Sequence, residues 1–315
     1  MPIPAKLRRS LAALSGAVPP RLRSAARPVA RRLGLAAAEG DWWLATTPPW
    51  VIPADAGRSF GAWCIICRWT GERFLGREDG ESADCPRCRS IARDRFLFWC
   101  FLTRTPDPFG MRVLETSPRL GEHYRERMRR WFDYTCSDFD SNSHRSELDL
   151  DLQAIDLPSN SLDVILTPHV LEHVPDTALA LTELFRVLKP GGRMYLQVPL
   201  VYGRTSVPVV PEFHEDNTPV CFNFGWDLTD LLRDAGFDAR VLVPAGYSAM
   251  LHGRHPFPPS PAEGFHVDEL AADVRLDEIE TVIDDEQATW LGIRPPYHFS
   301  TWEAIRPPAG GTDGR

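Results

Sequence analysis

The sequence predicts an α/β fold of the doubly wound type, in which helices cover both faces of a central, mostly parallel sheet. One observation is that short apolar runs alternate with amphipathic stretches from Met111 onward, as in chains built from strand–helix–strand units. The other observation is size. With 315 residues, 43% of them hydrophobic, the chain can form one full domain of roughly 150 to 200 residues plus smaller attachments.

The individual elements are predicted from short apolar runs and from apolar residues at helical spacing. Strands are expected at 112–116, 133–137, 162–167, 193–198, 239–243 and near 298–305. Helices are expected at 90–103, 121–130, 177–188 and 228–235. The segment 252–263 is dense in Pro and Gly and is therefore predicted to be a loop. These elements assign residues 105–310 to the main domain.

Three segments precede the main domain. Residues 1–40 are predicted to be a basic tail, because eight basic residues and no acidic residue lie between Lys6 and Arg32. Such a tail either forms amphipathic helices on anionic lipid or a partner, or stays disordered around its prolines. Residues 41–60 are a Trp- and Pro-rich connector, and residues 61–104 hold a cysteine-rich module and a linking helix.

Charge and hydropathy narrow the class of protein. The net charge of −8 argues against a general nucleic-acid binder, which needs Lys and Arg clustered on a broad face. No stretch approaches the roughly 20 consecutive apolar residues of a membrane helix, and the apolar run at 11–18 lacks a convincing cleavage site. We therefore expect a cytoplasmic protein whose basic tail could contact a membrane surface or a protein partner.

Four of the seven cysteines form two close pairs, Cys64-x-x-Cys67 and Cys85-x-x-Cys88, with 17 residues between the pairs. This spacing is typical of a zinc ribbon or a related four-cysteine knuckle, because two tight turns can direct four thiolates at one tetrahedral Zn²⁺. Four protein ligands leave no open position for water or substrate, so the zinc would be structural. Two disulfides, or four unliganded buried thiols, are the alternatives.

The most informative block of sequence runs from Leu162 to Pro199. It reads Leu162-Asp-Val-Ile-Leu-Thr-Pro-His-Val-Leu-Glu-His-Val-Pro-Asp176 and continues with Leu184-Phe-Arg-Val-Leu-Lys-Pro-Gly-Gly192. The pattern predicts a buried strand, a loop, an amphipathic helix and a second buried strand. Pro190 is expected to end the helix, and the two glycines after it permit a turn with positive φ.

This block resembles the class I S-adenosylmethionine-dependent methyltransferases, in the branch with a His-Val-Leu-Glu-His-Val-like loop after the fourth strand and Arg-Val-Leu-Lys-Pro-Gly-Gly before the fifth. The resemblance covers about residues 112–243. It implies a Rossmann-like, seven-stranded sheet, S-adenosyl-L-methionine as cofactor and methyl transfer as activity. Cys85-Pro-Arg-Cys-Arg-Ser-Ile-Ala-Arg-Asp-Arg95 also looks like a bacterial subgroup with a zinc knuckle before this domain.

The resemblance places the cofactor beyond the carboxyl ends of the strands, where open α/β sheets bind their ligands. Glu115 matches the acidic residue that ends the family's first strand. In the loop after it, Ser117, Pro118 and Arg119 stand where glycines are usual. Side chains at these positions restrict how closely the backbone can approach a ligand, so this loop departs from the family pattern.

Four more residues match family positions around the cofactor. Asp138 follows the second strand, where the family has a carboxylate that accepts hydrogen bonds from the ribose. Asp151 and Leu152 match the adenine clamp, although Asp149 competes with Asp151 for this role. His169 lies just beyond the fourth strand, where the resemblance implies a cofactor contact or a catalytic group near the transferred methyl group.

Methyl transfer is an in-line displacement at an activated sulfonium carbon, so the protein mainly aligns the acceptor and removes its proton where needed. The insertion at 200–226 is expected to form the acceptor pocket. His214 is a candidate general base, oriented by Glu215 or Asp216. The alternative for these residues is a solvated polar loop.

The acceptor class is narrowed by a missing motif. Methyltransferases that modify base amines use an Asn/Asp-Pro-Pro-Tyr/Phe loop, whereas here the fourth strand runs into Thr167-Pro168-His169. We therefore expect O-methylation of a small-molecule, glycan or lipid-linked acceptor. One alternative is an RNA methyltransferase. The other is a catalytically decayed scaffold that binds a partner through its zinc module.

Overall fold

The computed structural model describes residues 61–76, 83–200, 202–214, 217–257, 267–293 and 300–308. The predicted basic tail and the Trp- and Pro-rich connector lie outside the described residues, as do Glu215 and Asp216. Within the described part of the chain, no helix is both long and apolar enough to cross a bilayer.

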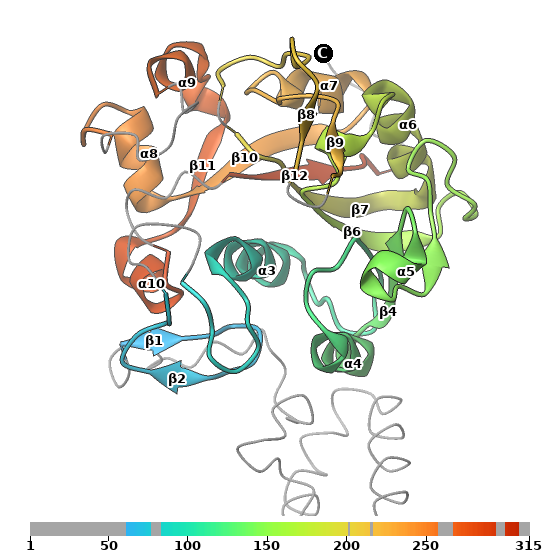
Figure 1. Cartoon of the computed structure of the whole chain (residues 1–315), viewed down its shortest axis with the longest axis horizontal. Helices are drawn as coiled ribbons and strands as arrows, with labels where there is room; N and C mark the ends of the chain where they lie inside the picture. The colour runs from blue at the N-terminus through green and yellow to red at the C-terminus, as the bar shows by residue number, and fades with distance from the viewer. Residues whose placement is uncertain are drawn as a thin grey trace, which may run out of the picture.

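An eight-stranded sheet forms the centre of the described fold (Figure 1), in the order β11-β10-β12-β7-β6-β3-β4-β5. Its strands are β3 (Arg112–Thr116), β4 (Asp133–Asp138), β5 (Leu148–Asp149), β6 (Leu162–Pro168), β7 (Leu188–Gln197), β10 (Asp238–Pro244), β11 (Ile279–Ile283) and β12 (Thr301–Ile305). All neighbours are parallel except those of β12, which is antiparallel to β7 and β10. The chain builds outward from β3 to β5 and then returns to β6, so the strand order reverses between β3 and β6.

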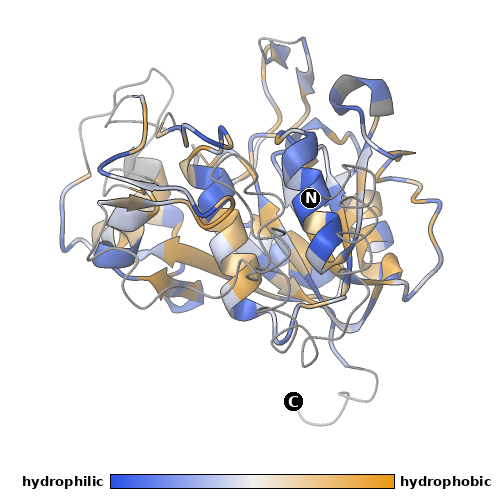
Figure 2. Ribbon diagram, turned by 90° about the horizontal axis from the view of Figure 1, so that it is seen from below, coloured by the Kyte–Doolittle hydropathy of each residue, from blue (hydrophilic) through white to orange (hydrophobic). Residues whose placement is uncertain are grey.

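Helices cover both faces of this sheet, as predicted. The longer helices are α3 (Ala92–Arg104), α4 (Glu122–Trp131), α6 (Thr177–Val187) and α7 (Leu228–Asp234). In Figure 1, α3 and α4 lie on one face, and α6 and α7 lie on the other. Each face has its own apolar core, one around α3 and α4 and one around α6 and α7. Figure 2 shows hydrophobic strands, and helices that carry both hydrophilic and hydrophobic residues.

The predicted strand bounds agree with the structure to within one residue at β3, β4, β6 and β10. The largest difference is in β7, which begins at Leu188 rather than at 193. The turn at Pro190–Gly192 is hydrogen-bonded to the residue that follows β12. Gly191 N–H donates to the Arg306 carbonyl, and Arg306 N–H donates to the Gly192 carbonyl. Gly191 has a φ of +80°, a conformation that glycine adopts without a steric cost.

The sheet has one strand more than the seven expected. The addition is β11, which pairs in parallel with β10 at the edge of the sheet. Its side chains are mostly half-buried, so it lacks the continuous apolar run that marks a central strand. The chain after β10 also contains three short helices without a predicted counterpart, α8 (Ala245–Leu251), α9 (Val267–Asp273) and α10 (Asp285–Trp290).

The cysteine-rich module contains a two-stranded antiparallel sheet, β1 (Ala62–Trp63) with β2 (Thr70–Gly71). It is packed onto the rest of the fold, with α10 against β1. The buried Arg95 of α3 joins the parts: its guanidinium donates to the carbonyls of Ala83, Ser90 and Leu291 and lies 3.8 Å from the Phe74 ring centre. The helix predicted to be a linker therefore packs on β7 and β12 and also holds the module.

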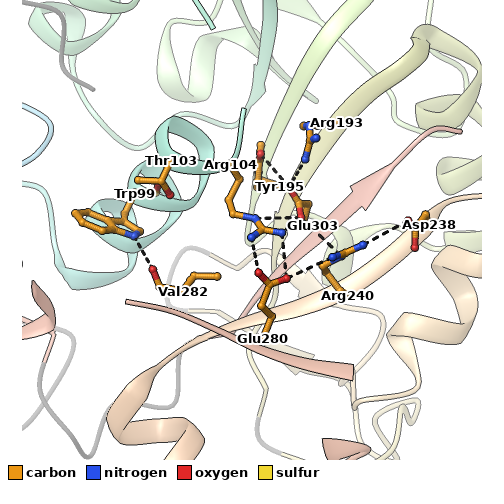
Figure 3. Close-up of polar contacts among 10 residues, drawn as sticks. All are labelled: Trp99, Thr103, Arg104, Arg193, Tyr195, Asp238, Arg240, Glu280, Val282 and Glu303. Atoms are coloured by element: carbon orange, nitrogen blue, oxygen red, sulfur yellow. Dashed lines mark hydrogen bonds and ion pairs between the residues drawn. The ribbon is translucent and has the colours of Figure 1, made fainter. Parts of the chain in front are cut away.

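A charged network anchors α3 to the sheet (Figure 3). Glu303 of β12 is fully buried, at 0% exposure, and accepts hydrogen bonds from Arg104 at 2.9 Å and Arg193 at 2.5 Å. Arg240 lies 3.9 Å from the same carboxylate, and Arg104 also pairs with Glu280 of β11. Because guanidinium groups surround the buried carboxylate, its charge is compensated, and the network joins α3 to four strands.

Candidate functional site

A cavity of about 810 Å³, called here the large cavity, lies where the strand order reverses. Its walls come from the segments that end or follow β3, β4, β6 and β7, and from the insertion after β7. Parallel strands all end at one edge of the sheet, so loops far apart in sequence meet there. The parallel arrangement of the strands thus places side chains from many segments around one cavity.

Six of the seven residues predicted to bind cofactor or act in catalysis line the large cavity. They are Ser117, Asp138, Asp151, Leu152, His169 and His214. Glu115 lies outside it and lines a neighbouring cavity of about 40 Å³, called here the small cavity, together with Ser117 and His169. The competing residue Asp149 belongs to β5 and does not line the large cavity.

Ser117, Asp138 and His144 form a hydrogen-bonded cluster in the wall of the large cavity. The Ser117 hydroxyl donates to Asp138 Oδ2 at 3.0 Å, and His144 Nδ1 lies 2.6 Å from the same oxygen. Ser117 has a φ of +48°, a conformation that favours glycine. The serine therefore keeps the backbone conformation of the expected glycine and adds a hydroxyl that holds the carboxylate.

The segment after β5 supplies a second carboxylate to the large cavity. Asp151 Oδ1 accepts hydrogen bonds from the backbone and the side-chain amide of Gln153, at 2.9 and 3.1 Å. Leu152 is buried at 4% exposure. This part of the wall pairs an acceptor of hydrogen bonds with an apolar side chain, which together suit a flat polar ring.

A group of histidines around Glu172 also lines the large cavity. His169 Nδ1 lies 3.5 Å and His173 Nε2 lies 3.9 Å from Glu172 Oε1. Glu172 is 1% exposed, and within the described structure neither of its oxygens accepts a hydrogen bond. The ring of His173 contacts the ring of His214, with centroids 4.7 Å apart. Imidazole groups, which can accept or donate a proton, thus lie beside a buried carboxyl group at this wall.

The insertion after β7 is held against this wall. Its hairpin consists of β8 (Glu212–Phe213) and β9 (Pro219–Val220). Cys221 and Phe222 both donate backbone N–H groups to the Glu172 carbonyl, and His173 Nδ1 lies 2.7 Å from the Pro219 carbonyl. These bonds bring His214 to the rim of the large cavity.

Glu115 is buried one layer behind the cavity wall. Its Oε2 accepts hydrogen bonds from the hydroxyls of Tyr134 at 2.7 Å and Tyr124 at 2.9 Å. Burial raises the pKa of the Glu115 carboxyl from 4.5 to about 7, and the two tyrosine hydroxyls oppose this rise. The protonated form is therefore the one that the fold favours at this position.

Glu115→Gln is expected to remove a pH dependence of stability. Because the pKa is raised from 4.5 in the unfolded chain to about 7 in the fold, the contribution of Glu115 is fully present below pH 4.5 and is lost as the pH rises to about 7. The loss amounts to about 3 kcal/mol. Urea unfolding at about pH 5 and about pH 8 measures it. Glu147→Gln, at a half-exposed ion pair with Arg129, is the control. If the free energy of unfolding of Glu115→Gln depended on pH as the wild type's does, Glu115 would not be the group responsible.

The sulfur atoms of the four paired cysteines lie close together in the cysteine-rich module. All four lie within 4.8 Å of one another. The Cys64–Cys88 and Cys67–Cys85 sulfur pairs are 3.6 and 3.5 Å apart. These separations far exceed a disulfide bond of about 2.05 Å, and they approach the edge of about 3.8 Å in a tetrahedron with Zn–S bonds of about 2.3 Å.

Several residues of the large cavity were not predicted from the sequence. They are Arg93, Arg119, Phe139, His144 and His173. Phe139 is 78% exposed, and its place directly after Asp138 at the end of a predicted strand could have indicated it. Nothing in the sequence pattern indicated His144, because the four-residue helix α5 (Ser141–His144) that carries it is too short to show a period.

The comparisons with known proteins agree with this geometry. Residues 91–241, from the start of α3 to β10, match the family described as "Methyltransferase domain". Residues 91–241, just under half of the chain, are therefore similar to a methyltransferase domain. The domain includes Ser117, Asp138, Asp151 and His169, and it excludes the four paired cysteines.

Two relatives illustrate the likeness. A protein of Mycolicibacterium smegmatis described as a probable S-adenosylmethionine-dependent methyltransferase is 36% identical over 104 residues, which cover 32% of this chain and 38% of the relative. The trans-aconitate 2-methyltransferase of Azoarcus is 29% identical over 148 residues, covering 44% and 47%. The chain spans less than half the length of the curated relatives it matches. A methyltransferase structure from Mesorhizobium loti shares 16% identity at a TM-score of 0.38, covering 68% of this chain and 98% of that one.

Proposed function

We propose that the chain transfers a methyl group from S-adenosyl-L-methionine to a small-molecule, glycan or lipid-linked acceptor, with oxygen as the favoured atom. The observation that carries this proposal is the large cavity, which is lined both by the carboxylates of Asp138 and Asp151 and by the imidazoles of His169 and His214. Carboxylates suit the hydroxyls and amine of the adenosine, and imidazoles suit the acceptor's proton.

We assign the carboxylate side of the large cavity to the cofactor. Asp138 would accept hydrogen bonds from the ribose hydroxyls, in the place now taken by Ser117 and His144. Asp151 would accept from the adenine amine while Leu152 packs on the ring. Glu115 supports the loop from behind, because Tyr124 and Tyr134 already donate hydrogen bonds to its Oε2.

We assign the histidine side to the acceptor. The cofactor supplies an electrophilic methyl group on sulfur. His169 would accept the proton of the acceptor hydroxyl as the new O–C bond forms and the C–S bond breaks, and the sulfur would leave as a neutral thioether. His214 would act at the same wall from the insertion, with His173 between the two rings.

We assign the four-cysteine cluster to one structural Zn²⁺. The sulfur separations fit a tetrahedral shell, and the four thiolates would complete it. A shell of this kind has no position for substrate, so its contribution is to the folding of the module. Cys64, Cys67 and Cys85 are buried and Cys88 is half-buried, which shields such a site from solvent.

Asp138→Ala is expected to weaken binding of S-adenosyl-L-methionine at least tenfold, because hydrogen bonds to a charged acceptor contribute about 1.5–3 kcal/mol. Isothermal titration calorimetry measures the affinity without an acceptor. Asp140→Ala is the matched control, since Asp140 is exposed, accepts hydrogen bonds from Asn142 and does not line the large cavity.

Three outcomes would contradict parts of the proposal. Equal affinities of the Asp138→Ala and Asp140→Ala variants would remove Asp138 from the cofactor site. A wild-type chain that binds no cofactor at millimolar concentration would favour the scaffold alternative. Tight binding of RNA at physiological salt would favour an RNA methyltransferase over the small-molecule acceptor.

A further inference from the structure

The loop after β3, whose glycines are replaced, is bonded directly to the second cysteine pair. The guanidinium of Arg119 donates to Asp94 Oδ2 at 2.6 Å and to the Arg89 carbonyl at 3.1 Å. Arg89 is the residue directly after Cys88, and Arg119 also lines the large cavity. One side chain thus reaches from the proposed cofactor site to the proposed metal site.

The Arg89 carbonyl is presented by the closed turn of the second cysteine pair. Arg89 N–H donates to the Cys85 carbonyl at 2.9 Å, and Cys85 N–H donates to the Ser90 carbonyl at 2.8 Å. Arg89 itself has a φ of +62°, a conformation that a side chain adopts only when the surrounding turn imposes it. The direction of this carbonyl therefore depends on the turn's remaining closed.

The other end of the contact is equally fixed. Asp94 Oδ2 also accepts the backbone N–H of Ile91 at 2.9 Å, at the start of α3. Its side chain is 13% exposed where it meets Arg119. Asp94 does not line the large cavity, so its bond to Arg119 can be tested without changing a direct cofactor contact.

The first cysteine pair reaches the same loop. Ile66, between Cys64 and Cys67, lines the small cavity together with Ser117 and Arg119. Leu120 belongs to the apolar core that contains Cys64, Cys67 and Cys85. Residues of both cysteine pairs' turns therefore lie near the loop after β3, where Ser117 has a positive φ although it is not a glycine.

We propose that Arg119 is a positioning residue that ties the loop after β3 to the four-cysteine module, so that cofactor affinity depends on the module's being closed around its metal. The inference rests on the proposed function, since it concerns the same cofactor site and the same zinc. In this arrangement, contacts from the four-cysteine module hold the conformation of the loop after β3, a role that glycines within the loop have elsewhere in the family.

Calorimetric titration with S-adenosyl-L-methionine tests the proposal on the full chain, with zinc content measured for each sample. Arg119→Ala and Asp94→Ala are each expected to weaken binding about fivefold while keeping one zinc per chain. The double variant is expected to bind no more weakly than Arg119→Ala alone, because both changes break one contact. Removal of zinc with a chelator is expected to weaken wild-type binding about fivefold and to leave the Arg119→Ala variant unchanged.

Arg89→Gly is the matched control. It keeps the carbonyl and suits the positive φ, so it is expected to bind cofactor as the wild type does. Loss of affinity in Arg119→Ala, with no loss in Asp94→Ala or on zinc removal, would overturn the proposal and make Arg119 a direct cofactor contact. Zinc removal could unfold the chain, which circular dichroism would show. In that case the cofactor affinities of the zinc-loaded single and double variants of Asp94 and Arg119 test the proposal. A wild type that binds no cofactor would instead overturn the proposed function.

Discussion

Cys85→Ala is expected to abolish stoichiometric zinc binding and to unfold the module at 61–90, with the largest loss of stability of any change considered. Binding of structural Zn²⁺ contributes about 10–16 kcal/mol to the folding of zinc-finger peptides. Here β1 is also packed against α10, and Arg95 bonds to Ala83 and Ser90, so part of the module's order is independent of the metal. We therefore expect a loss of about 5 kcal/mol or more.

Metal analysis of purified protein and chemical denaturation provide the two measurements. Cys100→Ala is the control, because Cys100 is a buried cysteine of α3 outside the cluster, and its removal costs only packing. A wild-type zinc content below half an equivalent per chain would contradict the metal assignment. Thiol titration then separates the alternatives, since disulfides give no reaction and unliganded thiols react without releasing metal.

Glu303→Gln is expected to destabilise the fold by about 3–5 kcal/mol, because removing one partner of a buried ion pair leaves the other charge uncompensated. Glu303 is fully buried and faces Arg104 and Arg193 directly. The variant keeps the shape of the side chain but lacks the negative charge. Urea denaturation monitored by circular dichroism gives the difference in the free energy of unfolding.

Asp238→Asn is the matched control for Glu303→Gln. Asp238 pairs with Arg240 of the same network at 3.5 Å, but its side chain is 63% exposed, and exposed pairs contribute at most about 1 kcal/mol. A loss below about 1 kcal/mol in Glu303→Gln would show that the three arginines are solvated without it. The network would then be peripheral to the stability of the sheet.

The strand pattern and the positions of the cavity residues could be predicted because both depend on local sequence. Apolar runs such as Val164 to Leu166 are buried strands, and the residue after each parallel strand must lie at the same sheet edge. Asp138 and His169 were therefore placed at one cavity from their positions after predicted strands together with the family resemblance. Their roles in binding and catalysis remain predictions.

The features missed from the sequence depend on contacts between distant segments. Tyr124 of α4 and Tyr134 of β4 donate to Glu115 because β4 pairs with β3 and α4 packs on β4, so the carboxylate matched from the family motif is buried one layer behind the large cavity. Arg119 meets Arg89, 30 residues earlier. No periodicity or spacing encodes such a pair, because it exists only once the module is packed on the sheet.

The position of β12 has a consequence for how the chain can fold during synthesis. This strand, Thr301–Ile305, is the last described strand in sequence, yet it lies between β7 and β10. Until it leaves the ribosome, the facing edges of β7 and β10 have no partner, and unpaired strand edges invite association with other chains. The central sheet is therefore completed only after translation of Thr301–Ile305, so nascent chains are most exposed to aggregation in the interval between synthesis of β10 and of β12.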